Sequence, residues 1–473
     1  MTRLRRRDFL KGAGLALAGP AFALDVKDTS RHMDRPNIVF IITDQQNSRM
    51  VGCAGNPYLK TPAMDSLAAG GVRFERAYCT NPVCVPSRFS LLTGRMPSAI
   101  GQRANPSRHL DPIPEAFKRQ GIGWLLRAAG YETSYGGKVH LPKGLTPEDL
   151  GFETLTRDER DGLTDTCADY LRRAHDRPFA LVASFINPHD ICYMAIRDFA
   201  TSNLDHLLVS KGETELSNLD AALERPPGAG EEQFFQSQCP PLPPNFEPQE
   251  NEPEAIRIMV EQRAFKKKAR EQWPGRRWRE HRWAYCRLTE MVDAQIGRLL
   301  DALRESGLDR DTLVVFSSDH GDHDSAHRLE HKSTPYEEAS CIPFIIRPPG
   351  GLPGPMVDDT HLVSNGLDLV PTLCDYAGTD APADLEGRSL RPIVEGARPR
   401  DWRDFVPVEG EFACMVRTDR YKYALYDEGE NREQLYDLRE DPHETRNAAG
   451  DAGKGPVLEE HRRLLQRVRG RVS

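Results

Sequence analysis

Three short, mainly apolar runs constrain the fold more than any other feature of the sequence. They are Asn37–Ile42, Phe179–Phe185 and Thr312–Ser317. A continuous run of this kind is typical of a strand that is buried on both faces of a parallel sheet. Helical patterns lie between the runs, at Ile113–Ala129 and Tyr285–Leu303. Strands that alternate with helices predict an α/β domain with a large, mainly parallel sheet flanked by helices.

The alternation fades near Pro371 and gives way to shorter elements. Three runs there predict antiparallel strands, and one amphipathic pattern predicts a last helix: 412–416, 421–426, 434–438 and 456–472. We therefore expect a large α/β domain over 36–375 and a smaller C-terminal α+β subdomain over 376–473, with an antiparallel sheet and a helix.

The stretch 197–278 interrupts the large domain. It is polar and charged, and it contains the proline-rich segment Cys239–Phe246. Long segments of this kind commonly form lids or binding walls. We expect an insertion that covers one face of the sheet, in which Trp273 and Trp278 help to select the ligand.

Composition narrows the class of protein. The chain has 473 residues, of which 28% are charged, and a net charge of −8. A nucleic-acid-binding protein usually carries a basic face, so this balance argues against a nucleic-acid partner. The ten cysteines are scattered without paired spacing. We expect most to be small buried hydrophobic residues, and the sequence leaves room for one disulfide.

Residues 1–23 resemble a twin-arginine signal peptide. Arg6 and Arg7 precede a short apolar stretch, Gly12–Ala23, which ends in a possible cleavage site, Ala21–Ala23. The stretch is too short to cross a bilayer as a helix. We expect a bacterial protein that the twin-arginine translocase exports to the periplasm or the medium, without a stable membrane span. A membrane anchor or a disordered tail is the alternative.

The segment Cys84–Arg95 predicts a helix with a reactive residue at its start. Pro86 suits a first helical turn, and Gly94 suits a helix end. The free N–H groups and the dipole at such an N-terminus favour an anion beside Cys84. Arg88, one turn further along, can reach back towards the same place.

The pattern Cys-x-Pro-Ser-Arg-x-x-x-Leu-Thr-Gly-Arg, which begins at Cys84, resembles the signature of type I sulfatases, in the alkaline phosphatase superfamily. In that family a formylglycine-generating or equivalent maturation enzyme converts this cysteine to a formylglycine aldehyde. The resemblance implies an alkaline-phosphatase-like fold and a modified residue at Cys84. An ordinary cysteine at the start of a helix is the plain alternative.

Acidic residues follow two of the predicted strands, in Thr43–Gln46 and Ser318–Asp322. Ligands of open α/β sheets gather at such carboxyl ends. Oxygen donors suit Ca²⁺ or Mg²⁺, and an imidazole also admits Mn²⁺. The resemblance implies Ca²⁺ as the first candidate and the following ligands: Asp44, Gln45, Cys84 as formylglycine, Asp319 and His320. The alternative for the aspartates is that they cap the helices that follow.

Two of these positions depart from the commonest family pattern. Gln45 stands where many sulfatases have a second aspartate, and His320 stands where they have asparagine. Both departures resemble choline sulfatases and the phosphonate or phosphate monoester hydrolases of the same superfamily. They leave the metal and the substrate open.

Further segments match elements of the family. Lys138 and His140 match its Gly-Lys-x-His element and would share one face of a strand. His189 matches its Pro-His element, although Ile191 replaces the usual proline. Lys332 lies thirteen residues after Asp319, at the offset of a sulfate-binding lysine.

Three histidines near Lys332 allow two interpretations. His327 matches a family position and is a candidate for binding substrate. His323, His327 and His331 recur every four residues and could be mistaken for a helical zinc stripe. We expect a loop over the site instead.

The resemblance implies hydrolysis of sulfate esters. One oxygen of the aldehyde hydrate would attack sulfur, aligned by the metal. Lys138, Lys332 and Arg88 would neutralise the transferred group, and His189 would protonate the leaving oxygen. The second hydroxyl, helped by His140, would expel sulfate and restore the aldehyde.

A sulfated carbohydrate is the first candidate substrate, by analogy with exported bacterial members of the family. The alternatives are a small choline-type sulfate ester, a phosphonate or phosphate ester, and a non-enzymatic protein that binds sulfated glycans.

Overall fold

The computed structural model describes residues 35–106, 109–228 and 230–470. The predicted signal peptide, residues 1–23, lies outside them. No helix in the described part of the chain combines the length and apolar character that crossing a bilayer requires.

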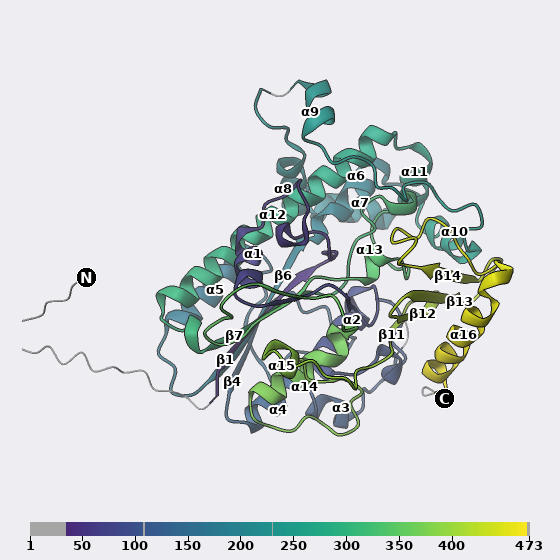
Figure 1. Ribbon diagram of the computed structural model, residues 1–473. Helices are drawn as coiled ribbons and strands as arrows, with labels where there is room; N and C mark the ends of the chain where they lie inside the picture. The colour runs from purple at the N-terminus through teal and green to yellow at the C-terminus, as the bar shows by residue number, and fades with distance from the viewer. Residues whose placement is uncertain (1–34, 107–108, 229, 471–473) are drawn as a thin grey trace, which may run out of the picture. The chain divides into compact units, whose positions relative to one another are not determined.

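The centre of the structure is an 8-stranded sheet with the order β5-β4-β6-β1-β7-β8-β2-β9 (Figure 1). β8 is antiparallel to both of its neighbours, and every other adjacent pair is parallel. The predicted mainly parallel sheet is confirmed, and the three apolar runs form its central strands, β6, β1 and β7. The strands are β1 (Asn37–Asp44), β2 (Val72–Phe74), β4 (Glu132–Gly137), β5 (Glu153–Thr156), β6 (Phe179–Pro188), β7 (Thr312–Ser318), β8 (Phe344–Arg347) and β9 (Met356–Asp358).

Helices cover both faces of this sheet (Figure 1). Val39 and Ile41 of β1 pack with one layer, and Ile38 and Phe40 pack with the other. Alternate side chains of a strand point to opposite faces, so a continuous apolar run serves two cores. One layer has α1 (Pro62–Ala69), α5 (Asp161–Arg172) and α12 (Gly275–Glu305), and the other has α2 (Cys84–Thr93), α4 (Ile122–Ala128) and α14 (Asn365–Tyr376).

Two helix predictions need correction. The pattern at 113–129 forms two helices, α3 (Glu115–Arg119) and α4, because Gly121 is extended and packs on Leu150, where a Cβ would lie 2.8 Å from a side-chain carbon. The pattern at 285–303 begins earlier, at Gly275, because the first turns of α12 bury Trp278 and Tyr285 against other helices instead of the sheet.

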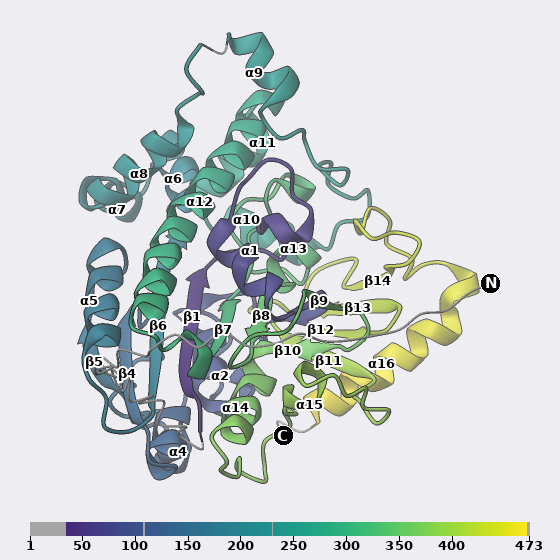
Figure 2. The same ribbon diagram turned by 60° about the vertical axis from the view of Figure 1, so that its left-hand side comes forward.

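The insertion is largely helical. The helix α6 (Tyr193–Phe199) leads into it. The helices within it are α7 (Asn203–Lys211), α8 (Glu213–Leu223), α9 (Glu231–Ser237), α10 (Glu254–Glu261) and α11 (Ala264–Gln272). Figure 2 shows α6 to α9 and α11 gathered near one end of α12. Residues of α6, α7, α8 and α11 share a core with Met50 and Ile191, from the segments that follow β1 and β6, and that core contains no strand residue. α9 packs separately on Trp283 of α12. The insertion therefore borders the carboxyl ends of the strands and does not cover a face of the sheet.

Trp273 and Trp278 belong to the core of this insertion. Their ring centroids lie 4.9 Å apart in an edge-to-face arrangement, and both side chains are buried. Because they are buried, they can influence the choice of ligand only indirectly, through the shape of the insertion. They stabilise the wall of the site from within.

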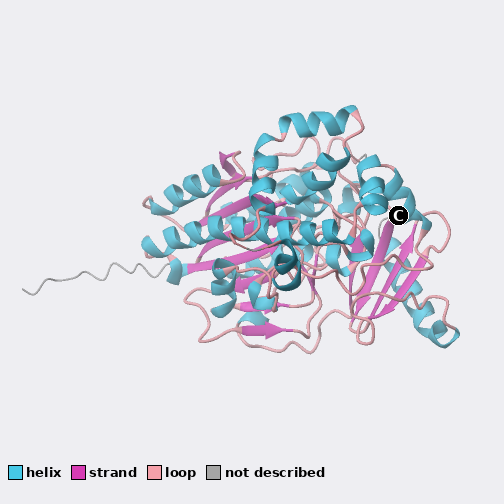
Figure 3. Cartoon of the chain, turned by 90° about the horizontal axis from the view of Figure 1, so that it is seen from above, coloured by secondary structure: helices cyan, strands magenta, loops and turns pink. Residues whose placement is uncertain are grey.

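The C-terminal part forms a second, antiparallel sheet of four strands. Its strands lie apart from those of the central sheet in Figure 3. Its strands are β11 (Phe405–Glu409), β12 (Ala413–Thr418), β13 (Tyr421–Tyr426) and β14 (Glu433–Asp437), and α16 (Gly455–Arg469) packs on one face. The predicted sheet and helix are confirmed. β11 was not predicted, because it contains Pro407, but it is an edge strand, where proline is tolerated.

Short elements complete the chain: β3 (Ala77–Tyr78) pairs with β10 (Val363–Ser364), and α13 (Glu337–Ser340) and α15 (Arg391–Val394) are single turns. All ten cysteines are free thiols, and nine of them are buried. The cysteines therefore act mainly as small hydrophobic residues, as expected.

A buried lysine links the C-terminal sheet to the segment that joins β7 to β8. Lys422 of β13 donates to the carbonyl of Pro335 over 2.8 Å, lies 3.1 Å from Glu337, and pairs with Glu444. Lys422→Met removes the cation and leaves two carboxylates in a dry environment. We expect it to lower the free energy of unfolding by roughly 3–5 kcal/mol, measured by urea denaturation.

Lys454→Met is the matched control for that variant. Lys454 pairs with Asp437 over 3.0 Å at the surface, with 26% of its side chain exposed, so its loss should change stability little. Equal effects of the two substitutions would contradict a structural role for Lys422.

Candidate active site

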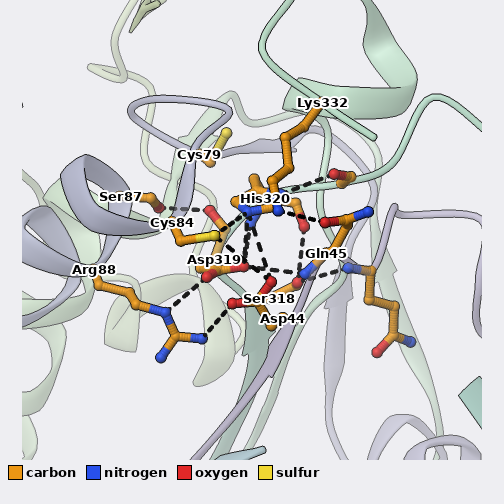
Figure 4. A network of polar contacts seen from close by, with 12 residues as sticks. Asp44, Gln45, Cys79, Cys84, Ser87, Arg88, Ser318, Asp319, His320 and Lys332 are labelled. Atoms are coloured by element: carbon orange, nitrogen blue, oxygen red, sulfur yellow. Dashed lines mark hydrogen bonds and ion pairs between the residues drawn. The ribbon is translucent and has the colours of Figure 1, made fainter. Parts of the chain in front are cut away.

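Polar residues from three parts of the chain meet at the carboxyl ends of β1 and β7 (Figure 4). β1 ends at Asp44, and Asp319 and His320 follow β7 directly. Cys84 is the first residue of α2, and Gly94 ends that helix with a φ of 71°. The structure thus contains the helix and both strand ends that the sequence predicts. The two strands are parallel neighbours, so their carboxyl ends lie together.

Asp44, Cys84, Asp319 and His320 form a buried cluster whose ligand atoms all lie within 4.8 Å of one another. Nε2 of His320 is 3.1 Å from Sγ of Cys84 and 3.8 Å from Oδ1 of Asp44. The sulfur marks the place where the oxygens of a formylglycine hydrate would lie.

The orientation of His320 fits a metal site. Its Nδ1 lies 2.8 Å from the carbonyl oxygen of Gly321. A carbonyl accepts only, so Nδ1 carries the proton and Nε2 turns its lone pair towards Asp44 and Asp319. A histidine held in this way by a backbone carbonyl is typical of a metal ligand. Two carboxylates and this imidazole are donors that a divalent cation accepts.

Arg88 lies behind the two carboxylates. Its Nε is 2.8 Å from Asp319 and its Nη2 is 3.0 Å from Asp44, while Nη1 donates to the carbonyl of Lys138 and to Ser184. Only 2% of its side chain is exposed. Arg88 thus reaches back over one helical turn, as predicted, but the groups that it contacts are the carboxylates, which it holds in place.

Two lysines and a histidine bring positive charge to the site. Nζ of Lys138 is 2.6 Å from Asp44, and Nζ of Lys332 contacts Oε1 of Gln45. Burial alone would raise the pKa of Asp44, but Lys138, His189 and Arg88 outweigh it and hold that pKa well below its usual range. His189 follows β6, and burial together with Lys138 and Lys332 lowers its pKa.

Gln45 is held in a left-handed conformation, with a φ of 69°. Its carbonyl accepts from the hydroxyl of Tyr285 over 2.6 Å, and its backbone N–H donates to Asp319 over 3.1 Å. Its Nε2 donates to Oδ2 of Asp322 over 2.6 Å, which leaves Oε1 facing Lys332.

The sequence interpretation did not include Asp322 or Tyr285 among the site residues. Asp322 stands in the acidic run after β7, which was the available indication. Tyr285 lies 240 residues from Gln45 in the chain, and no sequence pattern connects the two.

Two predicted residues lie elsewhere. His140 is exposed, and neither it nor Lys138 belongs to β4, which ends at Gly137. The prediction that they share a strand face is wrong, because Gly137 turns the chain with a φ of 92° at a place where a Cβ would lie 2.0 Å from the carbonyl oxygen of Ser184.

His327 is buried away from the cluster. Its ring stacks on Tyr336 with centroids 4.0 Å apart, and burial lowers its pKa to about 3. Its backbone N–H donates to the carbonyl of Asn245 over 2.6 Å, so it anchors the insertion. The histidines at 323, 327 and 331 lie on a loop with one short 3₁₀ turn, Ala326–Arg328, and not on a helical stripe, as expected.

The fold and the site together define the class of protein. The chain belongs to the sulfatase family: the family model described as Sulfatase matches residues 36–379, and one described as N-sulphoglucosamine sulphohydrolase, C-terminal, matches residues 325–471. It is a hydrolase of sulfate esters. The family implies a metal ion and a formylglycine made from the motif cysteine, and the buried cluster at Cys84 fits both.

Particular relatives cover nearly the whole chain. It is 32% identical over 480 residues to the Delta 4,5-hexuronate-2-O-sulfatase of Bacteroides thetaiotaomicron, a match that covers 96% of this chain and 91% of that protein. The N-acetylglucosamine-6-O-sulfatase of the same organism is 25% identical over 518 residues, covering 96% and 89%.

Solved structures agree with this assignment. A structure described as a 2-O GAG sulfatase has a TM-score of 0.76 and 30% identity, covering 93% of this chain and 92% of that one. The phosphonate monoester hydrolase of Agrobacterium radiobacter has a TM-score of 0.70 at 21% identity, covering 93% and 96%. The second likeness shows the shared fold alone.

Proposed function

We propose that this sulfatase removes a 2-O-sulfate from a uronate-containing saccharide. The observation that carries the proposal is the similarity to a hexuronate-2-O-sulfatase over nearly the full length of both chains. A sulfated glycan was also the first candidate from the sequence.

The nucleophile is the hydrate of formylglycine at residue 84. Lys138 and Lys332 bind the sulfate oxygens, since both ammonium groups lie at the cluster. His189 protonates the leaving sugar oxygen, as the family resemblance implies, because it stands half-buried at the end of β6 within the site. A bound sulfate ester offsets the charge of Lys138 and Lys332, which lowers the pKa of His189 in the free enzyme. Arg88 is a positioning residue that fixes the two carboxylates. No step is assigned to His140, whose side chain is exposed.

Ca²⁺ is the proposed metal, held by Asp44, Gln45, Asp319, His320 and formylglycine-84. Oxygen donors dominate this set, which favours Ca²⁺ over softer metals. The ion supplies charge that polarises the sulfate group and favours ionisation of the hydrate.

The proposed role of Gln45 gives a test at Asp322. Asp322→Leu removes the acceptor that orients the Gln45 amide, and we expect it to weaken Ca²⁺ binding about 10- to 100-fold, measured by calorimetric titration. Asp322→Asn keeps an oxygen that accepts from Nε2 of Gln45, so it should retain most of the affinity. Wild-type affinity in the leucine variant would exclude this positioning role.

We also propose that the enzyme acts outside the cytoplasm. A twin-arginine signal over 1–23 supports export in the folded state, after a maturation enzyme has modified Cys84. A periplasmic or secreted location brings the enzyme to its glycan substrate. Fusion of residues 1–35 to a reporter that works only after export tests this, with Arg6→Lys and Arg7→Lys together as the control.

One panel of substrates tests the proposed function. Sulfate release is measured on a 2-O-sulfated unsaturated uronate disaccharide, a 6-O-sulfated N-acetylglucosamine, choline sulfate, an aryl sulfate and an aryl phosphonate. The 2-O-sulfated disaccharide should show the highest kcat/KM. A higher value for choline sulfate or for the phosphonate would contradict the proposal and favour the corresponding alternative.

A further inference from the structure

One helix of the insertion lies over the loop that carries Lys332. In α11, Phe265 is buried and its ring centroid lies 5.6 Å from that of His331. Arg270, further along the same helix, lies 3.4 Å from the carbonyl oxygen of His327. Contacts at both ends of α11 therefore fix this helix against the segment 323–332.

Lys266 lies four residues before Arg270, on the same face of α11, and therefore faces the segment 323–332. Lys332, Asp322 and Cys192 all act electrostatically on its ammonium group, and Lys266 in turn acts on His323 and His331. Its side chain is half-buried. Lys266 thus lies within electrostatic reach of Lys332, the lysine proposed to bind the sulfate, although the two come from different parts of the chain.

Lys266 makes no hydrogen bond or ion pair within the described residues, unlike Lys267 and Arg270 of the same helix. Lys267, the next residue, lies 3.8 Å from Glu261, and Arg270 lies 2.7 Å from Glu252. Glu411 lies within the electrostatic reach of Lys266 but does not pair with it.

A half-buried ammonium without a partner is costly unless an anion binds to it. Burial and the neighbouring Lys332 lower the pKa of Lys266 to about 8, so the group still carries its proton at neutral pH. The nearby Lys332 contacts only the neutral amide of Gln45. Two ammonium groups on one side of the site thus lack a paired carboxylate, which is the arrangement expected for a ligand with two anionic groups.

We infer that Lys266 binds the carboxylate of the same uronate ring whose sulfate is removed. This inference rests on the proposed function, because a uronate carries a carboxylate in addition to the sulfate. Lys332 takes the sulfate and Lys266 takes the second charge, so the pair selects a ring with two anionic groups over a neutral sulfated sugar.

The test uses the full-length, modified enzyme and two matched substrates. One is the 2-O-sulfated unsaturated uronate disaccharide, and the other is its methyl ester, which keeps the sulfate but loses the carboxylate charge. Lys266→Met should lower kcat/KM on the acid about 10- to 100-fold more than on the ester, mainly through KM, since one charged hydrogen bond is lost. Lys266→Arg keeps the charge and should restore most of the preference.

Lys267→Met is the control, because Lys267 is exposed and already lies near the carboxylate of Glu261. It should leave the preference of the enzyme for the acid unchanged. Equal losses on acid and ester in Lys266→Met would mean a purely structural role and would overturn the inference, as would no loss on either. Wild-type enzyme that hydrolyses an aryl sulfate but not the disaccharide would instead overturn the proposed function itself.

Discussion

Cys84→Ala is expected to abolish sulfate release, with a fall in kcat of about 10⁶-fold, as when the nucleophile of other covalent hydrolases is removed. Alanine can neither form the aldehyde nor supply an attacking oxygen. The sulfur that it removes lies 3.1 Å from His320 and 3.8 Å from Asp44. These two residues are proposed metal ligands, so neither replaces the missing nucleophile. Release of inorganic sulfate from an aryl sulfate, followed by ion chromatography, measures the loss.

Cys53→Ser is the control for that experiment. Cys53 is half-exposed and lies in the 3₁₀ turn Gly52–Ala54, away from the cluster, so the variant should keep wild-type activity. Cys84→Ser should also be inactive, because a serine hydroxyl alone cannot form the hydrate that expels sulfate. Cys84→Ala protein with activity within tenfold of the wild type would contradict the assigned nucleophile.

Arg88→Met should have the second largest effect, on stability and on activity together. The substitution leaves Asp44 and Asp319 as buried carboxylates without the guanidinium that bridges them at 3.0 and 2.8 Å. Breaking a buried ion pair by removing one partner costs roughly 3–5 kcal/mol of unfolding free energy. Urea denaturation without added Ca²⁺ measures this cost, and sulfate release should fall with it because the carboxylates lose their fixed positions.

Arg298→Met controls for the loss of an arginine elsewhere. Arg298 pairs with Asp161 over 3.0 Å on the surface, with 50% of its side chain exposed, and its removal should change stability little. Arg88→Lys keeps the charge without the planar fork, so we expect an intermediate stability and a strong loss of activity. An Arg88→Met protein as stable and active as the wild type would exclude the bridging role.

The features that could be read from the sequence are local ones. The run Asn37–Ile42 alone identifies a strand buried on both faces, and the segment Cys84–Arg95 contains both the cysteine proposed to be modified and the glycine that ends its helix. Asp44 and Asp319 could be placed together because each directly follows such a strand, and parallel strands end at the same edge.

The features that could not be read depend on the folded chain. Gln45 is held by Asp322 and Tyr285, and the second of these is on α12, far away in the sequence. His140 lies outside the site because Gly137 turns the chain just before it. The φ angle of that glycine could not be predicted from the sequence. Tryptophan is common both in binding sites and in hydrophobic cores. The sequence alone does not show which of the two surrounds Trp273.

The mass of the tryptic peptide Ala77–Arg88 from active enzyme, after thiol alkylation, tests the central claim most directly. The peptide contains Cys79 and Cys84, so Cys79 is an internal control for alkylation. We predict one alkylated thiol, at Cys79, and at residue 84 an aldehyde that has lost the sulfur and two hydrogens, gained one oxygen and reacts with a hydrazide. Two alkylated thiols in fully active enzyme would contradict a formylglycine nucleophile.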